Sequence, residues 1–435
     1  MYISQVKLRN IKGFHGTREV DLKLRSPGWT VIAGRNGSGK TTLLRAIALA
    51  VAGTRVADVL APDFENWIST GHGDGSASVH LHDDPTMDSN ATAHDITRPW
   101  DASIRWMRLD QGPSHGGTQT FLLIPIDSAA DVGPWQPNPR GWFCAAYGPF
   151  RRLAGGSNDV QRLMVKPGAT ARLTSLFYED ASLAEGVTWL IRQHLRELEG
   201  HAEAAQLKQA ALNLLGDGLL PDYYRIDRVD SDGLWVFSGE HQFPLKEMSD
   251  GYRSVVALVV DLVKQLHECY GELTTDGTSI TAPGVVIIDE VDAHLHVSWQ
   301  KAIGGWLKAH FPNIQFIVTT HSPYVCQAAD PGGLIRLPGP SENSAPQVVD
   351  EDLYERVVYG SGDDAVLSEL FGLETPYSDR AVKLRSELVD LEVAVISGTA
   401  TDEQTRRYDE LKETLTSSPS ARAREVETRL KRSKT

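Results

Sequence analysis

Several residue types and patterns are scarce in this sequence, and each scarcity narrows what the chain can be. The 435 residues include three cysteines, Cys144, Cys269 and Cys326, which lie far apart and never form a CxxC pair. This spacing argues against a disulfide framework and a cysteine zinc site, and it suits a reducing compartment. Apolar runs are too short to span a bilayer, and the N-terminal segment alternates apolar and polar residues, unlike a signal peptide. We therefore expect a cytoplasmic protein without a membrane anchor.

Positive charge is also in deficit, because 43 Lys and Arg residues face 57 Asp and Glu residues, a formal net charge of −14. Overall charge therefore does not attract nucleic acid, although a local basic patch can still bind it. The hydrophobic fraction of 41% is ordinary for a globular chain, so disorder is not expected. No repeat of fixed period and no sustained heptad pattern is found.

Strand and helix patterns alternate in two parts of the chain, near the N-terminus and after residue 249. Such alternation predicts an α/β protein with a parallel sheet covered by helices. The expected strands are 2–8, 29–33, 284–289 and 315–320, and the expected helices are 41–52, 253–268 and 297–311.

The segment between these parts has a different texture. Residues 70–140 are rich in Gly, Asp, Ser and Pro, which predicts short strands and loops. Helices are expected at 183–198 and 202–215, followed by a strand pair at 223–229 and 234–237. The tail from 364 has helical periodicity and ends in a basic run at 422–434, which favours a solvated helix face over a nucleic-acid patch. The domains expected from these changes are 1–54, 55–240, 241–335 and 336–435.

A glycine-rich loop at Gly34–Thr41 satisfies the pattern G-x-x-x-x-G-K-[ST], with a strand before it and a helix after it. Its backbone N–H groups and the positive end of the helix are suited to surround phosphates. Lys40 is expected to reach the β- and γ-phosphates of ATP, and Thr41 to bind Mg²⁺. An ordinary glycine-rich turn is the alternative, but it gives no reason for a lysine there.

Two carboxylates, Asp289 and Glu290, follow an apolar strand. Ligands of parallel sheets gather at the carboxyl ends of strands, so Asp289 is expected to hold Mg²⁺ and Glu290 to polarise an attacking water. A solvated loop after a core strand would show the same two residues, but the phosphate loop makes this alternative less favoured.

Two further segments could contribute to the same site as the glycine-rich loop. Ser249 and the residues up to Arg253 begin a long helix, whose N-terminus is suited to an anion, although a plain serine cap fits equally well. His321 ends an apolar strand and could sense the γ-phosphate, or be an ordinary histidine at a strand edge. The pair His294 and His296 is weak support for a metal site.

These four elements occur in the order found in ABC ATPases. The chain resembles the ABC-type AAA ATPases of the RecF, SMC and OLD kind. Within these it is most similar to the stand-alone ATPases of bacterial anti-phage defence, such as the Septu and retron-associated ATPases. The resemblance implies an α/β ABC-ATPase head with a P-loop parallel sheet and flanking helices, an inserted mixed α/β lobe and a C-terminal helical tail.

The resemblance also assigns roles to matching residues. Glu290, His321 and Lys40 would be catalytic, whereas Thr41 and Asp289 would hold the Mg²⁺. Asp250 stands where many relatives have glycine, and Tyr147–Leu153 is similar to a segment of the subgroup. The residues implied to contact ATP are Gly34, Arg35, Asn36, Gly37, Ser38, Gly39, Lys40, Thr41 and Thr42, with Ser249, Gly251 and Arg253 of the signature and Asp292 of the D-loop.

In ABC ATPases the signature of one protomer closes on the ATP of the other, which implies a head-to-tail homodimer, with higher assembly left open. No nuclease site is recognised after His321, so a separate effector, plausibly a nuclease, is expected to be controlled by ATP. Arg151 and Arg152 could approach phosphate or DNA, or form a solvated pair. The alternative function is a RecF/SMC-like DNA-repair ATPase that binds DNA directly. A transporter motor fits the long insertion poorly.

Overall fold

The computed structural model describes residues 1–61, 64, 66–88, 100–109, 120–126, 133–136, 139–153, 155–221, 223–373 and 375–415. The chain forms two compact units, Met1–Asp350 and Glu351–Thr435. The basic run at 422–434 lies outside the described residues. No helix within the described ranges is long and apolar enough to cross a bilayer.

A six-stranded sheet forms the centre of the first unit, in the order β16-β15-β3-β14-β13-β7. The five strands from β15 to β7 are parallel, and only β16 runs antiparallel to its neighbour. Apolar strands β13 and β14 are buried on both faces, as expected for a sheet covered by helices on both sides. The strands are β3 (Gly28–Gly34), β7 (Cys144–Tyr147), β13 (Gly284–Ile288), β14 (Ile314–Thr320), β15 (Leu334–Leu337) and β16 (Gln347–Val348).

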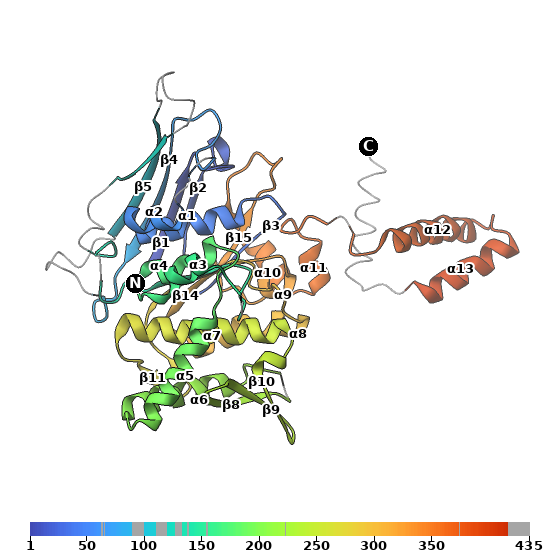
Figure 1. Cartoon of the computed structure of the whole chain (residues 1–435). Helices are drawn as coiled ribbons and strands as arrows, with labels where there is room; N and C mark the ends of the chain where they lie inside the picture. Colours follow the sequence, from blue (N-terminus) through green and yellow to red (C-terminus); the bar gives the residue numbers. More distant parts are fainter. Residues whose placement is uncertain are drawn as a thin grey trace. The chain divides into compact units, whose positions relative to one another are not determined.

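A second, five-stranded antiparallel sheet has the order β2-β1-β4-β5-β6. Helix α1 lies along it in Figure 1, and α1 also follows directly from β3 of the central sheet. The buried face of α1 belongs to the same apolar core as β1, β4 and β5. The elements are β1 (Tyr2–Arg9), η1 (Gly16–Arg18), β2 (Val20–Lys23), α1 (Lys40–Ala52), α2 (Thr54–Leu60), β4 (Asp74–His82), β5 (Trp100–Leu109) and β6 (Thr120–Pro125).

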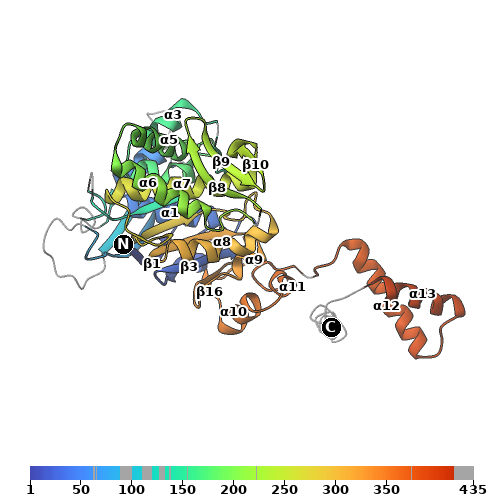
Figure 2. The ribbon, with the colours of Figure 1, turned by 90° about the horizontal axis from the view of Figure 1, so that it is seen from below.

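Helix α7 separates the central sheet from a lobe of helices and a three-stranded sheet, as Figures 1 and 2 show. It is apolar around most of its circumference because it is covered on both sides. The lobe consists of α5 (Ala184–Leu198), α6 (Ala202–Gly216), β8 (Arg225–Asp230), β9 (Gly233–Ser238), β10 (His241–Pro244) and η3 (Leu245–Glu247), beside α7 (Asp250–Tyr270). Helices α3 (Asn158–Val165) and α4 (Ala169–Phe177) lie apart from this lobe: α3 packs on α4, and α4 packs against β7 and α1. The unit is completed by β11 (Thr275–Asp276), β12 (Ser279–Ile280), α8 (Val297–His310) and α9 (Pro323–Cys326).

The second unit is helical in its described part. Its helices are α10 (Glu351–Val358), α11 (Gly362–Val366), α12 (Asp379–Ile396) and α13 (Asp402–Thr414). Helices α12 and α13 pack as a hairpin that carries an ion pair between Arg407 and Glu387. Thr401 caps α13 through a reciprocal capping box with Gln404, as its position before the helix predicts.

Two segments that were expected to lie outside the sheet-forming parts of the chain contribute strands to the central sheet. Strand β7, from the expected insert 55–240, pairs with β13 in the central sheet. Strands β15 and β16 occupy part of the expected linker after residue 335 and extend the opposite edge of that sheet. Residues far apart in the sequence therefore belong to one sheet.

Candidate functional site

Three neighbouring parallel strands end together at one edge of the central sheet. Strand β14 lies between β3 and β13, and Thr320 is level with Ala33 while Val318 is level with Ile288. The loops after these strands carry the glycine-rich segment, Asp289 with Glu290, and His321. The sheet thus brings three groups of predicted site residues together, although the first and the last group are more than 200 residues apart in the sequence.

The glycine-rich loop has a backbone that only glycine adopts readily. Gly37 and Gly39 have φ values of 76° and 99°. A Cβ on Gly39 would lie 2.7 Å from the ring of Phe14, so the loop also has no room for a side chain there. Arg35, Asn36 and Gly37 are exposed, whereas Ser38 and Lys40 are buried. The Ser38 hydroxyl has no hydrogen-bond partner in the described structure, which leaves a polar group for a ligand.

Lys40 folds back onto its own loop. Its ammonium donates to the carbonyls of Gly34 at 2.9 Å and Arg35 at 3.3 Å. Burial lowers the pKa of Lys40, and the carboxylates of Asp289, Glu290 and Asp292 oppose that shift. A cation held against carbonyl groups can turn to stronger acceptors, and phosphate oxygens are such acceptors.

The hydroxyl of Thr41 donates a 2.7 Å hydrogen bond to Asp289, across the gap between β3 and β13. The other carboxylate oxygen of Asp289 accepts a hydrogen bond from Thr319 on β14. Asp289 is buried, and its neighbours fix its orientation. A carboxylate and a hydroxyl oxygen in contact are the hard ligands that Mg²⁺ prefers.

Glu290 and Asp292, which follow β13, are joined by hydrogen bonds to the end of β14. The backbone N–H of Glu290 donates to the Thr319 hydroxyl at 2.8 Å, and Glu290 has a φ of 46°. Asp292 accepts a hydrogen bond from the Thr320 hydroxyl and another from the His321 N–H at 3.3 Å. Burial and the Lys40 cation lower the pKa of His321, while the three nearby carboxylates oppose the shift. His321, which the sequence suggested could sense the γ-phosphate, therefore lies close enough to Lys40 and the carboxylates to interact with their charges.

The signature segment lies at the start of α7, where Ser249 and Asp250 are exposed and the residues up to Arg253 are half-buried. Ser249 occupies the N-cap position, but its side chain makes no cap hydrogen bond. Arg253 is held within its own segment, through the Lys246 carbonyl at 3.2 Å and an ion pair with Asp250. Gly251 contacts the D-loop, since a Cβ there would lie 2.2 Å from the His294 carbonyl oxygen. The signature and D-loop of one chain are thus packed together.

Arg151 has neither of the roles expected from sequence, contact with phosphate or DNA or membership of a solvated pair. Its side chain is buried, and its guanidinium donates to five main-chain carbonyls between Gly148 and Ala293. Burial lowers the pKa of Arg151 to about 10 against the opposing pull of Asp292. The guanidinium therefore fixes the backbone that carries Asp289 and Glu290. Arg152, its neighbour, is exposed.

A second buried contact joins the central sheet to the signature helix. The Tyr147 hydroxyl, at the end of β7, donates to Asp261 on α7 at 3.0 Å. Burial raises the pKa of Asp261, and Lys264 partly opposes this. Sequence reasoning missed Arg151, Tyr147 and Asp261 as site supports, because only the placement of β7 beside β13 brings them there.

The two histidines of the D-loop region show no sign of a metal site. His296 caps helix α8, and its Nδ1 accepts a hydrogen bond from the Ser298 N–H at 3.3 Å. Across the described part of the chain, no group of three or more His, Cys, Asp or Glu side chains is placed to hold a metal. The side chain of His296 therefore serves as the cap of α8.

The similarity to known proteins covers the parts of the chain that form this site. The family described as "AAA domain, putative AbiEii toxin, Type IV TA system" matches residues 173–327, and a second AAA domain family matches residues 5–81. The Septu protein PtuA of Bacillus mycoides (strain KBAB4) is 24% identical over 329 residues, which cover 74% of this chain and 38% of that protein. The Retron Ec83 probable ATPase of Escherichia coli is 36% identical over 148 residues, 33% of this chain and 25% of that protein.

The chain is similar to ABC-type AAA ATPases, including these Septu and retron proteins. The matched regions span about a quarter to two fifths of the length of these two relatives. Among solved structures, the SMC head bound to the C-winged helix domain of ScpA aligns with a TM-score of 0.46 and 17% identity, over 80% of this chain and 98% of that chain. The family matches bracket the phosphate loop, the signature, Asp289 and His321.

Proposed function

We propose that this protein binds ATP with Mg²⁺ and hydrolyses it to ADP and phosphate. The observation that carries the proposal is the direct contact between Thr41 in the glycine-rich loop and Asp289 at the end of β13. It joins a phosphate-binding backbone to a buried carboxylate at the one place where a metal–phosphate complex needs both. The unpartnered Ser38 hydroxyl and the positive-φ glycines of the loop fit the same ligand.

Each residue has a distinct part in this proposal. Lys40 would exchange its loop carbonyls for phosphate oxygens, and Thr41 and Asp289 would hold the Mg²⁺. The metal, when bound, supplies positive charge that neutralises the phosphates. Glu290 would accept a proton from the water that attacks the γ-phosphate, and His321 would donate to that phosphate. Asp292 keeps His321 in place by accepting its backbone N–H.

The exposed signature supports a dimer as the active form. Ser249 begins a helix of 21 residues whose first N–H groups have no side-chain cap, which favours an anion there. The packing of Gly251 on His294 joins the signature to the D-loop of the same chain. We infer that Ser249, Gly251 and Arg253 close on ATP bound to a second copy, in a head-to-tail homodimer.

We propose that in the cell this ATPase controls a separate effector of anti-phage defence, such as a nuclease. The support is the relationship to the Septu and retron proteins. ATP would open or close the dimer, and the effector would respond to whether the dimer is open or closed.

The ATPase proposal is tested by phosphate release from purified protein across a Mg²⁺ titration. Wild type should turn over ATP only with Mg²⁺. Lys40→Ala should lose nucleotide affinity, and Asp289→Asn should retain a measurable part of it but lose the Mg²⁺ response. Turnover that is unchanged in both variants would refute the proposed site.

The effector proposal is tested by purifying the tagged chain from its native operon, with and without ATP. We expect a co-purifying protein whose amount differs between the two conditions. The Glu290→Gln and Lys40→Ala variants should change that amount in opposite directions. A preparation of the chain alone that cleaves DNA with Mg²⁺, and loses this activity on mutation outside 34–42, would contradict a separate effector.

A further inference from the structure

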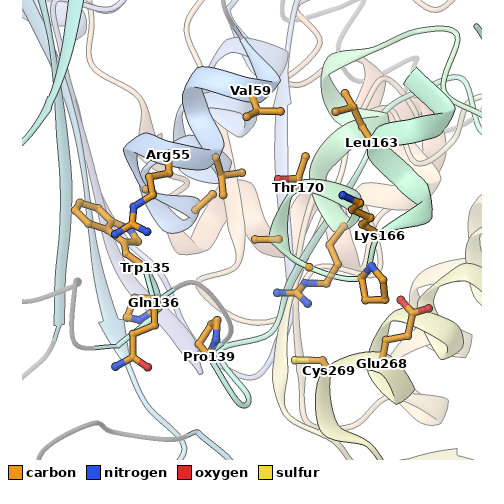
Figure 3. A pocket seen from close by; sticks show the side chains of 18 of the residues that line it. Arg55, Val59, Trp135, Gln136, Pro139, Leu163, Lys166, Thr170, Glu268 and Cys269 are labelled. Atoms are coloured by element: carbon orange, nitrogen blue, oxygen red, sulfur yellow. The ribbon is translucent and has the colours of Figure 1, made fainter. Parts of the chain in front are cut away.

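A large cavity lies between the α1–α2 junction, α3, the start of α4 and the end of α7. Its volume is about 1110 Å³, slightly above the usual range for small-molecule sites. Figure 3 shows Arg55 and Trp135 on one side, Leu163 and Lys166 on the opposite side, and Glu268 and Cys269 from α7 beside them. Nothing in the ATPase site described above uses this space.

The charged residues that line the cavity are mostly cationic. They include the exposed Arg55, Arg162 and Lys166, and the buried Arg172. Arg162 is paired with Asp159, while Arg55 and Lys166 form no hydrogen bond or ion pair within the described residues. Glu268 is the carboxylate of the lining. A cavity with this excess of cations favours an anion over a neutral ligand.

Arg172 is the strongest indication of a ligand. It is 7% exposed, and its Nε donates to the Cys144 carbonyl at 3.2 Å while its guanidinium lies over the Phe143 ring. Its two terminal nitrogens make no hydrogen bond with any described residue. Because Arg172 lines the cavity, these terminal donors are available to an acceptor that enters it. Phosphate oxygens match the fork of these donors in geometry and charge.

The charge of Glu268 is only partly available to neutralise Arg172. Burial raises the pKa of Glu268, and the nearby Arg172 and Lys264 lower it in opposition. The Glu268 carboxylate lies 3.9 Å from the Lys264 ammonium, and its second oxygen has no hydrogen-bond partner in the described structure. Glu268 therefore shares its charge with Lys264, and Arg172 keeps its donors for something else.

The remaining lining suits a nucleotide-sized molecule. Helix α4 begins at Ala169 with no side-chain cap, and its first N–H groups add positive potential beside Lys166. The apolar side chains Val56, Val59 and Leu163 and the indole of Trp135 line the same space. Apolar walls with a few charged groups are the usual make-up of a small-molecule site, and cationic groups favour a phosphorylated ligand.

We propose that this cavity binds a phosphate-bearing small molecule of nucleotide size, with Arg172 holding the phosphate. The site is separate from the glycine-rich loop. Helix α1 begins in that loop at Lys40 and ends on the cavity at Ala52, about 18 Å away at 1.5 Å per residue. Helix α7 likewise runs from the signature to Glu268.

The test isolates the cavity from the ATP site. Full-length protein carrying Lys40→Ala, without Mg²⁺ or ATP, is titrated by calorimetry with guanosine monophosphate, adenosine monophosphate and inorganic phosphate. We expect saturable binding of at least one probe with a dissociation constant below about 1 mM, weakening with salt. Absence of saturable binding for all three would overturn the proposal.

Variants then locate any binding. In the same Lys40→Ala background, Arg172→Gln should weaken binding at least tenfold, and Arg55→Glu at least threefold. Arg225→Gln, an exposed arginine on β8, should leave it unchanged. Because Arg172→Gln changes a buried residue, Arg55→Glu decides the matter if the former fails to fold. Equal affinity in Arg55→Glu and the control, or binding of short single-stranded DNA but of no mononucleotide, would assign the probes elsewhere and overturn the proposal.

Discussion

The Thr41 hydroxyl donates to the Asp289 carboxylate at 2.7 Å, although the two residues are 248 positions apart in the sequence. The contact exists because β3 and β13 both flank β14 and end at the same sheet edge. In the proposed complex, the phosphate loop and the carboxylate pair would share one position for a metal. Glu290, the next residue, would then lie beside the phosphate end of the nucleotide.

Replacing Glu290 by Gln removes the proposed proton acceptor without changing size or packing. We expect ATP binding to be retained and turnover to fall by about 10²-fold or more. The dimer should persist in ATP, because hydrolysis no longer reopens it. Phosphate release and light scattering after gel filtration measure the two effects. Glu272→Gln, an exposed residue in a loop, is the matched control. Normal turnover in Glu290→Gln would remove Glu290 from its role.

Arg151 holds the backbone of the carboxylate segment, so its loss should affect both stability and catalysis. Arg151→Met removes a buried guanidinium and leaves several main-chain carbonyls without a donor. We expect a loss of about 3 kcal/mol in the free energy of unfolding and a lower turnover number. Urea unfolding monitored by circular dichroism measures the first.

The neighbouring Arg152 provides the control for that variant. Arg152→Met should change stability by about 0.5 kcal/mol or less, because the side chain is exposed. Rates of ATP turnover should be normal. If both variants behaved alike, the guanidinium of Arg151 would not be what fixes this segment.

Asp261 makes stability depend on pH in a defined direction. Its pKa is 3.8 in the unfolded reference and is raised by burial in the folded protein. The folded state therefore keeps this proton to higher pH, and the stability that the neutral carboxyl contributes is lost as pH rises from about 4 through the raised pKa. Asp261→Asn cannot ionise but can still accept from Tyr147.

The stability difference between Asp261→Asn and wild type should therefore grow in favour of the variant as pH rises above about 4, then become constant. Chemical unfolding at a series of pH values measures this difference. Glu268→Gln, examined separately, accounts for the other buried carboxyl of α7, whose pKa is also raised. A difference that does not vary with pH would show that Asp261 titrates normally.

The sequence predicted most of the central sheet, and which residues gather where its strands end, because these signals are contiguous. The phosphate loop lies in eight consecutive residues, and the helix expected at 41–52 is α1, one residue longer at its start. Asp289, Glu290 and His321 each end an apolar strand, so the parallel sheet brings them together. Caps such as Thr401 were equally local.

The supports of the site were not predictable in this way. The sequence placed β7 in an insertion, whereas it is an edge strand of the central sheet beside β13. Arg151 and Tyr147 follow or end that strand, so their partners on β13 and α7 depend on a pairing that no local pattern encodes. The same reason hides the cavity, which residues from five separate segments surround. Single arginines in a sequence give no sign of being buried.

The central claim is that a second chain completes each ATP site, and mixing two inactive variants tests it most directly. Lys40→Ala disables the phosphate loop, and Ser249→Arg disables the signature. In a mixed dimer, one site combines both defects and the other combines the intact loop of one chain with the intact signature of its partner. Random mixing should restore about a quarter of the wild-type turnover. A mixture no more active than the average of the two separate variants would contradict the claim.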